Sequence, residues 1–372
     1  MTALSYILST CGTSLLTNGR SDEERKLVTK YSNERERQTI PALDAAKLDT
    51  IIAEVETRLV AADQPTVAKL SAELNALVRF YEGQSFASRD EHSLLCTDTW
   101  LGEAAARLVE TWLRQQGCPV TVLRQRDLQT AHLNAFQLAL SDLVRWIEQT
   151  IPGYRKDGYR IIFNLTGGFK SVQGFLQSLA PFYADEVVYI FESQKELLRI
   201  PRLPVRMAAT ETVRATLMTF RRLSKNLSVE EVGGIPETLL LHDEGKVTLS
   251  PWGELIWNQV KDGIYAEQLW PSPSVLLVFG PKFADSVKDL APDRKAIINA
   301  RIDDLARYLE TGRTINPASL DFKALYGNAM RPSTHECDAW ADQGAKRLFG
   351  HFEDDTDTFV LDKLDKKLPS KN

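Results

Sequence analysis

The sequence has few cysteines and histidines, the residues that bind zinc most often and, for cysteine, form disulfides. Its 372 residues include 4 cysteines and 5 histidines. The cysteines stand far apart and form no CxxC pair, at Cys11, Cys96, Cys118 and Cys337. This spacing gives no zinc signature and is typical of reduced thiols in a cytosol. The histidines are scattered as well, so we expect neither a metal site nor a cofactor.

Long apolar runs and a large excess of one charge sign are also missing. No run of about 18 apolar residues is present, which disfavours a membrane span. The N-terminal segment MTALSYILSTCGTSLL lacks the basic region with which a signal peptide begins. The net charge of -5 argues against nonspecific nucleic-acid binding by the whole chain. We therefore expect a cytoplasmic protein that does not associate with membranes.

The chain is long enough for two or three domains, each with a core of its own. Hydrophobic residues make up 43% and charged residues 26% of the sequence, as in ordinary globular proteins. Two proline-containing segments, 199–205 and 271–273, read as linkers. We therefore expect domains at residues 1–200, 201–270 and 271–372.

The first region alternates predicted strands with predicted helices. Short apolar runs predict strands at residues 4–8, 93–96, 119–123, 159–163 and 186–191. Between the first two strands, apolar residues at helical spacing predict a long helical insertion, including helices over 44–60 and 66–81. Strands that alternate with helices form a mostly parallel sheet covered on both faces. The predicted fold class is therefore α/β, with a Rossmann-like N-terminal sheet.

Three loops that follow predicted strands carry small polar residues, at 9–14, 97–99 and 164–171. Ligands of parallel sheets bind at the carboxyl ends of strands, so we expect these loops to converge on one edge. The third loop reads NLTGGFKS. Its glycines allow close approach of the backbone to a ligand, and free N–H groups at a helix start favour an anion. The motif predicts a phosphate-bearing ligand, or alternatively a tight strand-to-helix turn that binds nothing.

The remaining two regions differ in character. Residues 201–270 contain two short predicted helices, a hairpin and a helix that begins near Ser250, which is the element order of a winged-helix module. Glu254 and Leu255 stand where a DNA-binding helix would carry basic residues, so we favour a structural or dimerising role. Residues 271–372 predict a strand, a helical hairpin and antiparallel strands, which is a small α+β unit.

The motif NLTGGFKS, together with the loops STCGTS and TDT, resembles the CRISPR-associated Rossmann fold (CARF) family over about the first 200 residues. Members of this family dimerise and bind cyclic oligoadenylate across the two-fold axis. The resemblance implies a homodimer with cyclic oligoadenylate, expected to be the tetra-adenylate, as its allosteric activator. It also implies ligand contacts by Thr10, Gly12, Thr13, Ser14, Thr97, Asp98, Asn164, Thr166, Gly167, Gly168 and Lys170.

The last hundred residues resemble the RelE/ParE toxin fold, through LDFKALYG followed by strands containing HECDAW, KRLFGHFEDD and FVLDKLDKK. Nucleases of this fold cleave messenger RNA in the ribosomal A site. The resemblance implies a metal-independent endoribonuclease with the ribosome and mRNA as partners. Its candidate catalytic residues are Arg347, His351, Lys366, Lys367, His335 and Asp338. Asp338 and Trp340 replace two lysines of some members, and no tyrosine follows the last strand, which leaves the general base open.

The chemistry expected of these residues follows from their types. RNA cleavage by a 2′-OH needs a base, a cation for the phosphorane and an acid for the leaving oxygen. Arg347 suits the cation because guanidinium grips phosphate in a bidentate way, and His351 or His335 suits proton transfer. Alternation in KRLFGHF places Arg347 and His351 on one strand face, as a catalytic pair or as a solvated strand edge. The spacings RxxxH at 331–335 and 347–351 are too short for the HEPN nuclease motif.

The hypothesis is a sensor of cyclic oligoadenylate that activates cleavage of mRNA on the ribosome in type III CRISPR defence. Residues 271–372 carry 15 basic and 16 acidic residues, which favours a substrate presented by a large partner over free RNA. Three alternatives remain: a ligand-responsive transcription regulator, a ring nuclease that cleaves its own ligand through Lys170 and nearby hydroxyls, and a C-terminal domain that only binds.

Overall fold

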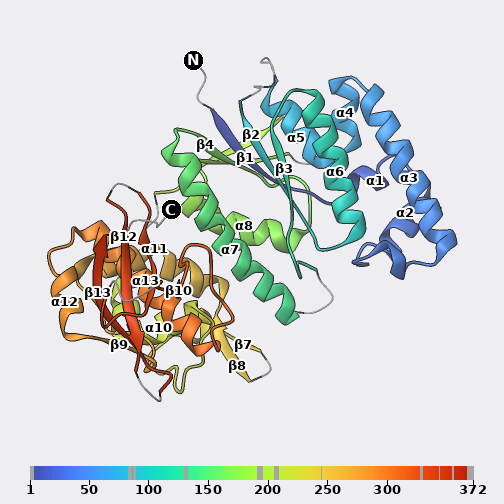
Figure 1. Ribbon diagram of the computed structural model, residues 1–372. Helices are drawn as coiled ribbons and strands as arrows, with labels where there is room; N and C mark the ends of the chain where they lie inside the picture. The colour runs from blue at the N-terminus through green and yellow to red at the C-terminus, as the bar shows by residue number, and fades with distance from the viewer. Residues whose placement is uncertain are drawn as a thin grey trace. The chain divides into compact units, whose positions relative to one another are not determined.

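The chain divides into two compact units, Met1–Arg206 and Met207–Asn372. The computed structural model (Figure 1) describes residues 4–82, 86, 89–129, 133–190, 196–204, 209–243, 245–326, 330–342, 344–353 and 356–366. The first unit corresponds to the predicted N-terminal region. The segments 207–270 and 271–372, which we separate on sequence, belong to one compact unit.

A six-stranded sheet forms the centre of the first unit, in the order β3-β2-β1-β4-β5-β6. Its strands are β1 (Ser5–Thr10), β2 (Glu91–Cys96), β3 (Val120–Arg124), β4 (Arg160–Asn164), β5 (Glu186–Tyr189) and β6 (Leu198–Pro201). The first five strands are parallel, and β6 pairs antiparallel to β5. The predicted mostly parallel sheet is confirmed. The linker predicted at 199–205 is wrong at its start, because backbone pairing with β5 recruits residues 198–201 as an edge strand.

Helices cover both faces of this sheet, as the burial of consecutive residues requires, since all six residues of β1 are buried. Ile7 of β1 packs in a core with residues from helices α3, α5 and α6, whereas the ring of its neighbour Tyr6 contacts that of Tyr154 in α7. Figure 1 shows α5 and α6 on one side of the sheet and α7 and α8 on the other. The helices are α1 (Ser14–Thr17), α2 (Asp22–Lys30), α3 (Ala42–Ala61), α4 (Gln64–Leu70), α5 (Ala72–Phe80), α6 (Trp100–Gln115), α7 (Leu133–Lys156) and α8 (Lys170–Tyr183), with a 3-10 turn at Arg37–Thr39.

The order in which the chain adds strands to this sheet reverses at β1. From β1 the chain builds outward through β2 to β3, and it then returns to place β4 on the other side of β1. The loops that leave the carboxyl ends of β1 and β4 therefore run to opposite sides. In open α/β sheets the crevice outside such a switch point is where ligands bind. The predicted loops 9–14 and 164–171 leave these two strands.

The second unit begins with helices and a hairpin that pack against its C-terminal part. Its first elements are α9 (Thr210–Ala215), α10 (Leu217–Ser224), a 3-10 turn (Glu237–Leu239), β7 (Leu240–Asp243), β8 (Lys246–Leu249) and α11 (Pro251–Glu267). The helix α11 packs along α13 (Pro292–Glu310), and Glu254 and Leu255 near its start are buried. Side chains that would read DNA from α11 are thus turned into the unit's own core.

A buried ion pair joins the two segments of this unit. Arg221 of α10 donates from Nε to Asp303 Oδ1 of α13 at 2.8 Å, and Tyr265 of α11 donates to the other carboxylate oxygen. The side chains of Arg221 and Asp303 are 0% and 2% exposed. Water does not screen a pair at this depth, so the contact ties residues 207–270 to residues 271–372.

A mixed five-stranded sheet forms the rest of the second unit, in the order β10-β11-β12-β13-β9. Its elements are β9 (Leu277–Phe279), α12 (Pro281–Val287), α13, β10 (Lys323–Ala324), β11 (His335–Trp340), β12 (Lys346–Phe352) and β13 (Phe359–Lys366). The strands are antiparallel except β9, which runs parallel to β13. Ile302 and Leu305 of α13 pack with Leu348 of β12, so this helix covers one face of the sheet. The predicted strand, helical hairpin and antiparallel strands are confirmed.

Candidate functional site

The loops that follow β1 and β4 meet at the switch point of the N-terminal sheet. A Cβ atom added to Gly12 would lie 3.0 Å from the Cα of Gly168. Gly168 has a φ of +93°, and a Cβ there would lie 3.0 Å from the Cβ of Thr10. Gly12 and Gly168 are therefore both required for the two loops to pack. For Gly168, this packing is a structural reason that needs no ligand.

Hydrogen bonds hold the two loops in register. The hydroxyl of Thr10 donates to the carbonyl of Gly167, and the side chain of Gln173 donates to the same oxygen at 2.7 Å. The buried amide of Asn164 donates to Ser9 Oγ at 3.2 Å and accepts from the backbone of Thr166 at 3.3 Å. Of the predicted ligand residues, Thr10, Asn164 and Gly167 thus hold the two loops together.

A carboxylate that the sequence analysis misses lies between the loops. Glu73, in the first turn of α5, is 1% exposed. It accepts a hydrogen bond from the Gly12 N–H at 2.6 Å, from the Ser14 hydroxyl at 2.9 Å and from the Ser71 hydroxyl. A Cβ on Gly167 would lie 2.1 Å from the Glu73 Cδ. Apolar periodicity marks the helix, but it does not distinguish Glu73 from a solvent-facing glutamate.

The α8 side of the crevice keeps the features that favour an anion. The N-cap residue Phe169 offers no side-chain cap, and the first turn of α8 contains no acidic residue. The first N–H groups of a helix without such a cap are open to an anion, which the helix dipole also favours. Lys170 and Ser171 are exposed in this turn, and Thr13 and Thr166 are partly exposed on the two loops. This side can hold a phosphate group.

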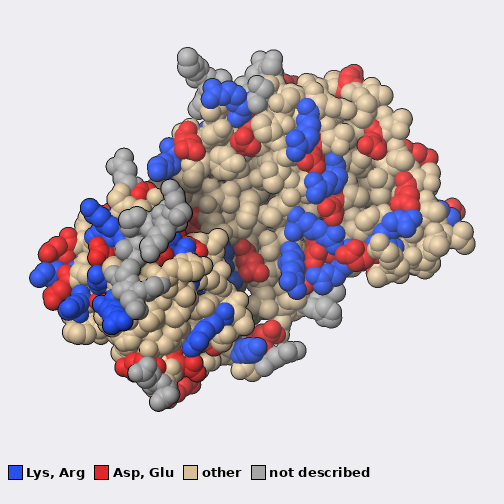
Figure 2. Space-filling model, in the orientation of Figure 1, with Lys and Arg blue, Asp and Glu red and all other residues tan. Residues whose placement is uncertain are grey.

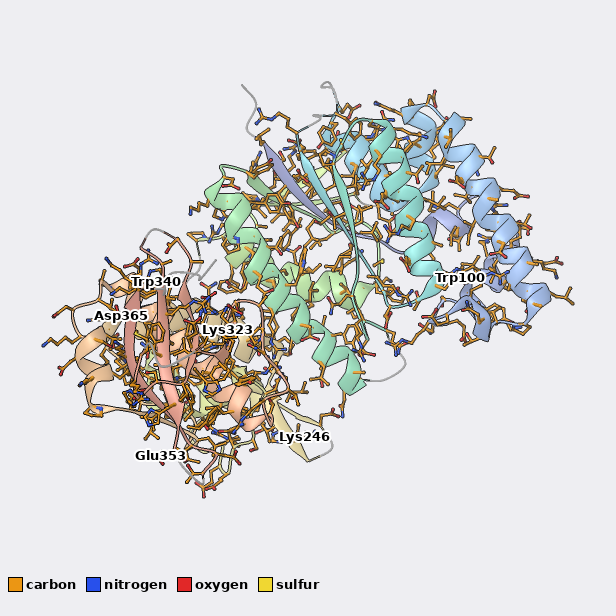
Figure 3. All side chains as sticks on the ribbon, in the orientation of Figure 1. Trp100, Lys246, Lys323, Trp340, Glu353 and Asp365 are labelled. Carbon is orange, nitrogen blue, oxygen red and sulfur yellow. The ribbon has the colours of Figure 1, made fainter. Side chains whose placement is uncertain are left out.

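The third predicted loop, which follows β2, contains a hydrogen-bond network of its own. Asp98 accepts hydrogen bonds from Arg35, from Arg124 at 2.8 Å and from the Asp127 N–H at 3.0 Å. Burial opposes ionisation, but these hydrogen bonds prevail and lower the pKa of Asp98. The hydroxyl of Thr97 pairs with that of Thr99, the N-cap of α6, at 2.9 Å. These contacts explain Asp98 and Thr97 as a structural network beside α6, whose first residue, Trp100, is labelled in Figure 3.

In the second unit, Arg347 lies among carboxylates and is not free to bind phosphate in this arrangement. Its guanidinium contacts Glu336 at 2.9 Å, Asp321 at 3.0 Å and Asp338 at 2.8 Å, and its side chain is 3% exposed. Asp321 also pairs with Lys323, labelled in Figure 3, and this hydrogen bond lowers the pKa of Asp321. Three acidic partners more than neutralise one cation, so the site has little attraction for an anion.

The predicted histidines lie on opposite faces of the C-terminal sheet. Leu348 and Phe352 face α13, so alternation places Arg347 and His351 on the other face, as expected. Four residues along a strand span roughly 13 Å, which is too far for both side chains to contact one phosphate. His335 lies on the α13 face, where its ring stacks on Phe322 at 5.2 Å. Burial, with a contribution from Arg313, lowers the pKa of His335.

His351 has a partner that orients it. Its Nδ1 lies 2.9 Å from Asp362 Oδ2, and the same oxygen accepts from the Ser333 hydroxyl at 2.7 Å. A carboxylate on Nδ1 keeps the proton there and leaves Nε2 as an acceptor. Lys366 is exposed at the end of β13, opposite Lys346, and Lys367 lies outside the described residues. Sequence patterns do not reveal Asp362 and Ser333 as partners of this histidine, because the contact depends on the pairing of β12 with β13, in which His351 lies opposite Val360.

Figure 2 shows basic and acidic side chains interspersed on the visible face of each unit, without one large basic patch. Within the described ranges, no three His, Cys, Asp or Glu side chains gather as a metal site. No helix in those ranges has the length and apolar character needed to cross a bilayer.

Comparison with known proteins relates the first unit to CRISPR systems. Residues 68–203 match the family model described as CRISPR-associated protein (Cas_APE2256). The matched segment includes Glu73 and the loop after β4, and it ends before the second unit. No curated protein matches the chain. The similarity to a CRISPR-associated protein is therefore established for this segment, and the resemblance of the C-terminal unit to RelE/ParE toxins stays a prediction.

Proposed function

We propose that the N-terminal unit binds a cyclic oligoadenylate at the crevice between the loops after β1 and β4, and so acts as a sensor in CRISPR defence. The observation that carries this proposal is the uncapped N-terminus of α8, with Lys170 in its first turn, at the topological switch point of a parallel sheet. The match of residues 68–203 to a CRISPR-associated family supports the biological setting. As in CARF proteins, two copies would share one ligand across a two-fold axis.

Calorimetric titration of the full chain with cyclic tri-, tetra- and hexa-adenylate tests this function. We expect tight binding of one ring size with one ligand per two chains. Lys170→Ala should weaken binding by roughly tenfold, since a charge-assisted contact to phosphate is worth about 1.5–3 kcal/mol before solvent screening. Lys156→Ala is the matched control, because Lys156 is exposed at the end of α7 that precedes β4, at the opposite edge of the sheet. Absence of binding for all three rings would refute the proposal.

We also propose RNA cleavage by the C-terminal unit, switched on by the ligand. The contact that favours this second activity is His351 Nδ1 to Asp362 Oδ2, which leaves Nε2 able to take a proton from a ribose 2′-OH. Arg347 serves in this scheme as a buried structural cation, and Lys366 lies opposite Lys346, five residues along β12 from His351. The cation that stabilises the phosphorane must therefore be another group. The ligand activates only if it binds the active arrangement more tightly than the resting one.

Cell-free translation with and without cyclic tetra-adenylate, followed by mapping of 5′ ends on the message, tests the second activity. We expect ligand-dependent cuts that require ribosomes and disappear in His351→Ala. His242→Ala is the control, because that histidine lies on β7 with a side chain that is 52% exposed. The same incubations report the ring-nuclease alternative, which would appear as linear products of the ligand. An intact message with the ligand bound would refute RNA cleavage and keep the sensor.

A further inference from the structure

The hydrogen-bond donors of the loop after β1 that could bind a phosphate already donate to a side chain of the protein, that of Glu73. The Gly12 N–H lies 2.6 Å from Glu73 Oε1, and the Ser14 hydroxyl lies 2.9 Å from Oε2. Glu73 is 1% exposed, so protein atoms rather than solvent surround its carboxylate. The α1 and α8 sides of the crevice thus differ, because the α8 side has no internal anion in its first turn.

Carboxylate and phosphate oxygens are both anionic acceptors, so they compete for the hydrogen bonds of these two donors. An anionic acceptor forms shorter and stronger hydrogen bonds than a neutral one, and two anions that share an amide and a hydroxyl also repel each other. A ligand phosphate can therefore reach Gly12 and Ser14 only by displacing Glu73. Gly167 makes room for the carboxylate, since any Cβ at that position would overlap its Cδ at 2.1 Å.

We infer that Glu73 is a specificity-determining residue of the ligand site, which competes with a ligand phosphate for the Gly12 amide and the Ser14 hydroxyl. This inference rests on the proposed function of the crevice. A mononucleotide that contacts one side only gains too little to displace the carboxylate. A cyclic oligonucleotide presents several phosphates in one rigid ring, so its contacts with α8 hold it in place while another phosphate displaces Glu73. The internal carboxylate therefore selects rings over single nucleotides.

Glu73→Gln tests the inference, because the amide keeps the shape of the side chain and removes its charge. Titration of the wild-type and variant chains with the cyclic oligoadenylates and with AMP should show binding of the preferred ring at least about tenfold tighter in the variant, with a larger relative gain for AMP. Thermal unfolding should show the variant to be less stable, because charge-assisted buried hydrogen bonds are weakened. A purely structural Glu73 predicts weaker or unchanged binding together with the loss of stability.

Glu186→Gln is the matched control. Glu186 is also buried and ion-paired, with Arg160, but it begins β5 at the amino edge of the sheet. This variant should lose stability without a gain in affinity. Ser14→Ala provides a second readout: the gain in affinity should be smaller when Glu73→Gln is made in the Ser14→Ala chain than when it is made in the wild-type chain.

The possible outcomes distinguish the role of Glu73 from the proposed binding of cyclic oligoadenylate. Wild-type binding with no gain in Glu73→Gln overturns the role of Glu73 and keeps the sensor. Binding by the Glu73→Gln chain alone supports both the sensor and the role of Glu73, and places the wild-type affinity below the range of the assay. No ring bound by either chain overturns the sensor, and the role of Glu73 falls with it.

Discussion

Replacing Arg221 with alanine should destabilise the second unit severely. The change leaves Asp303, whose side chain is 2% exposed, without the guanidinium that donates to it at 2.8 Å. Removing one partner of a buried ion pair costs about 3–5 kcal/mol, because the remaining charge is neither solvated nor paired. For a unit of this size, each kcal/mol lowers the melting temperature by roughly 2–4 °C, so the expected shift is about 6–20 °C.

Thermal unfolding of the full chain, followed by tryptophan fluorescence and circular dichroism, measures this shift. Arg214→Ala is the control, because it removes the same side chain from an ion pair with Glu267 in which both partners are more than 40% exposed. Exposed pairs contribute about 0–1 kcal/mol, so this variant should melt almost like the wild type. Equal melting temperatures for the two variants would refute the reasoning, and would mean that residues 207–270 and 271–372 do not depend on the buried pair.

Two further predictions concern the first unit. Gly167→Ala should destabilise it by about 1–3 kcal/mol in urea unfolding, since the new methyl overlaps Glu73. Gly174 is exposed within α8 and an added Cβ meets open space there, so Gly174→Ala should stabilise the unit by about 0.5–1 kcal/mol. Equal effects of the two changes would contradict the packing argument. Burial lowers the pKa of His92 to about 3, so the unfolded chain binds this proton more tightly than the folded chain. The free energy of unfolding should therefore fall by about 1.4 kcal/mol for each unit that the pH is lowered between roughly pH 6.5 and 3. His92→Phe should flatten this pH dependence in melting experiments at pH 7 and 5, and an unchanged slope would show that other groups cause it.

The alternation of strands and helices in the first unit can be read from the sequence because each element carries its own local signal. The apolar run YRIIF becomes β4, and the Gly-Gly turn after it leads into α8 as expected. The antiparallel edge strand β6 carries no such signal. Leu198–Pro201 is a short segment with a proline, and it becomes a strand only because β5 offers unpaired backbone groups beside it.

The prediction of two domains within residues 201–372 shows a different limit of sequence patterns, since residues 207–372 form one compact unit. Proline-rich composition at 271–273 marks a turn of the chain, which is a local property. Whether the flanking segments share a core depends on partners such as Arg221 and Asp303, 82 positions apart. Sequence patterns report the amphipathic face of α11, but they do not say which helix covers it.

For the site, the sequence by itself determined that glycines, hydroxyls and a lysine follow two strands of a parallel sheet, and parallel topology then brings their loops to one edge. Only the tertiary structure decided which of these groups stay available. Glu73 arrives from the helical insertion and takes the donors of Gly12 and Ser14, and three carboxylates surround Arg347. Residue type specifies what a side chain can bind, but charges brought from distant positions determine what it does bind, because Coulomb interactions depend on separation in space and on burial.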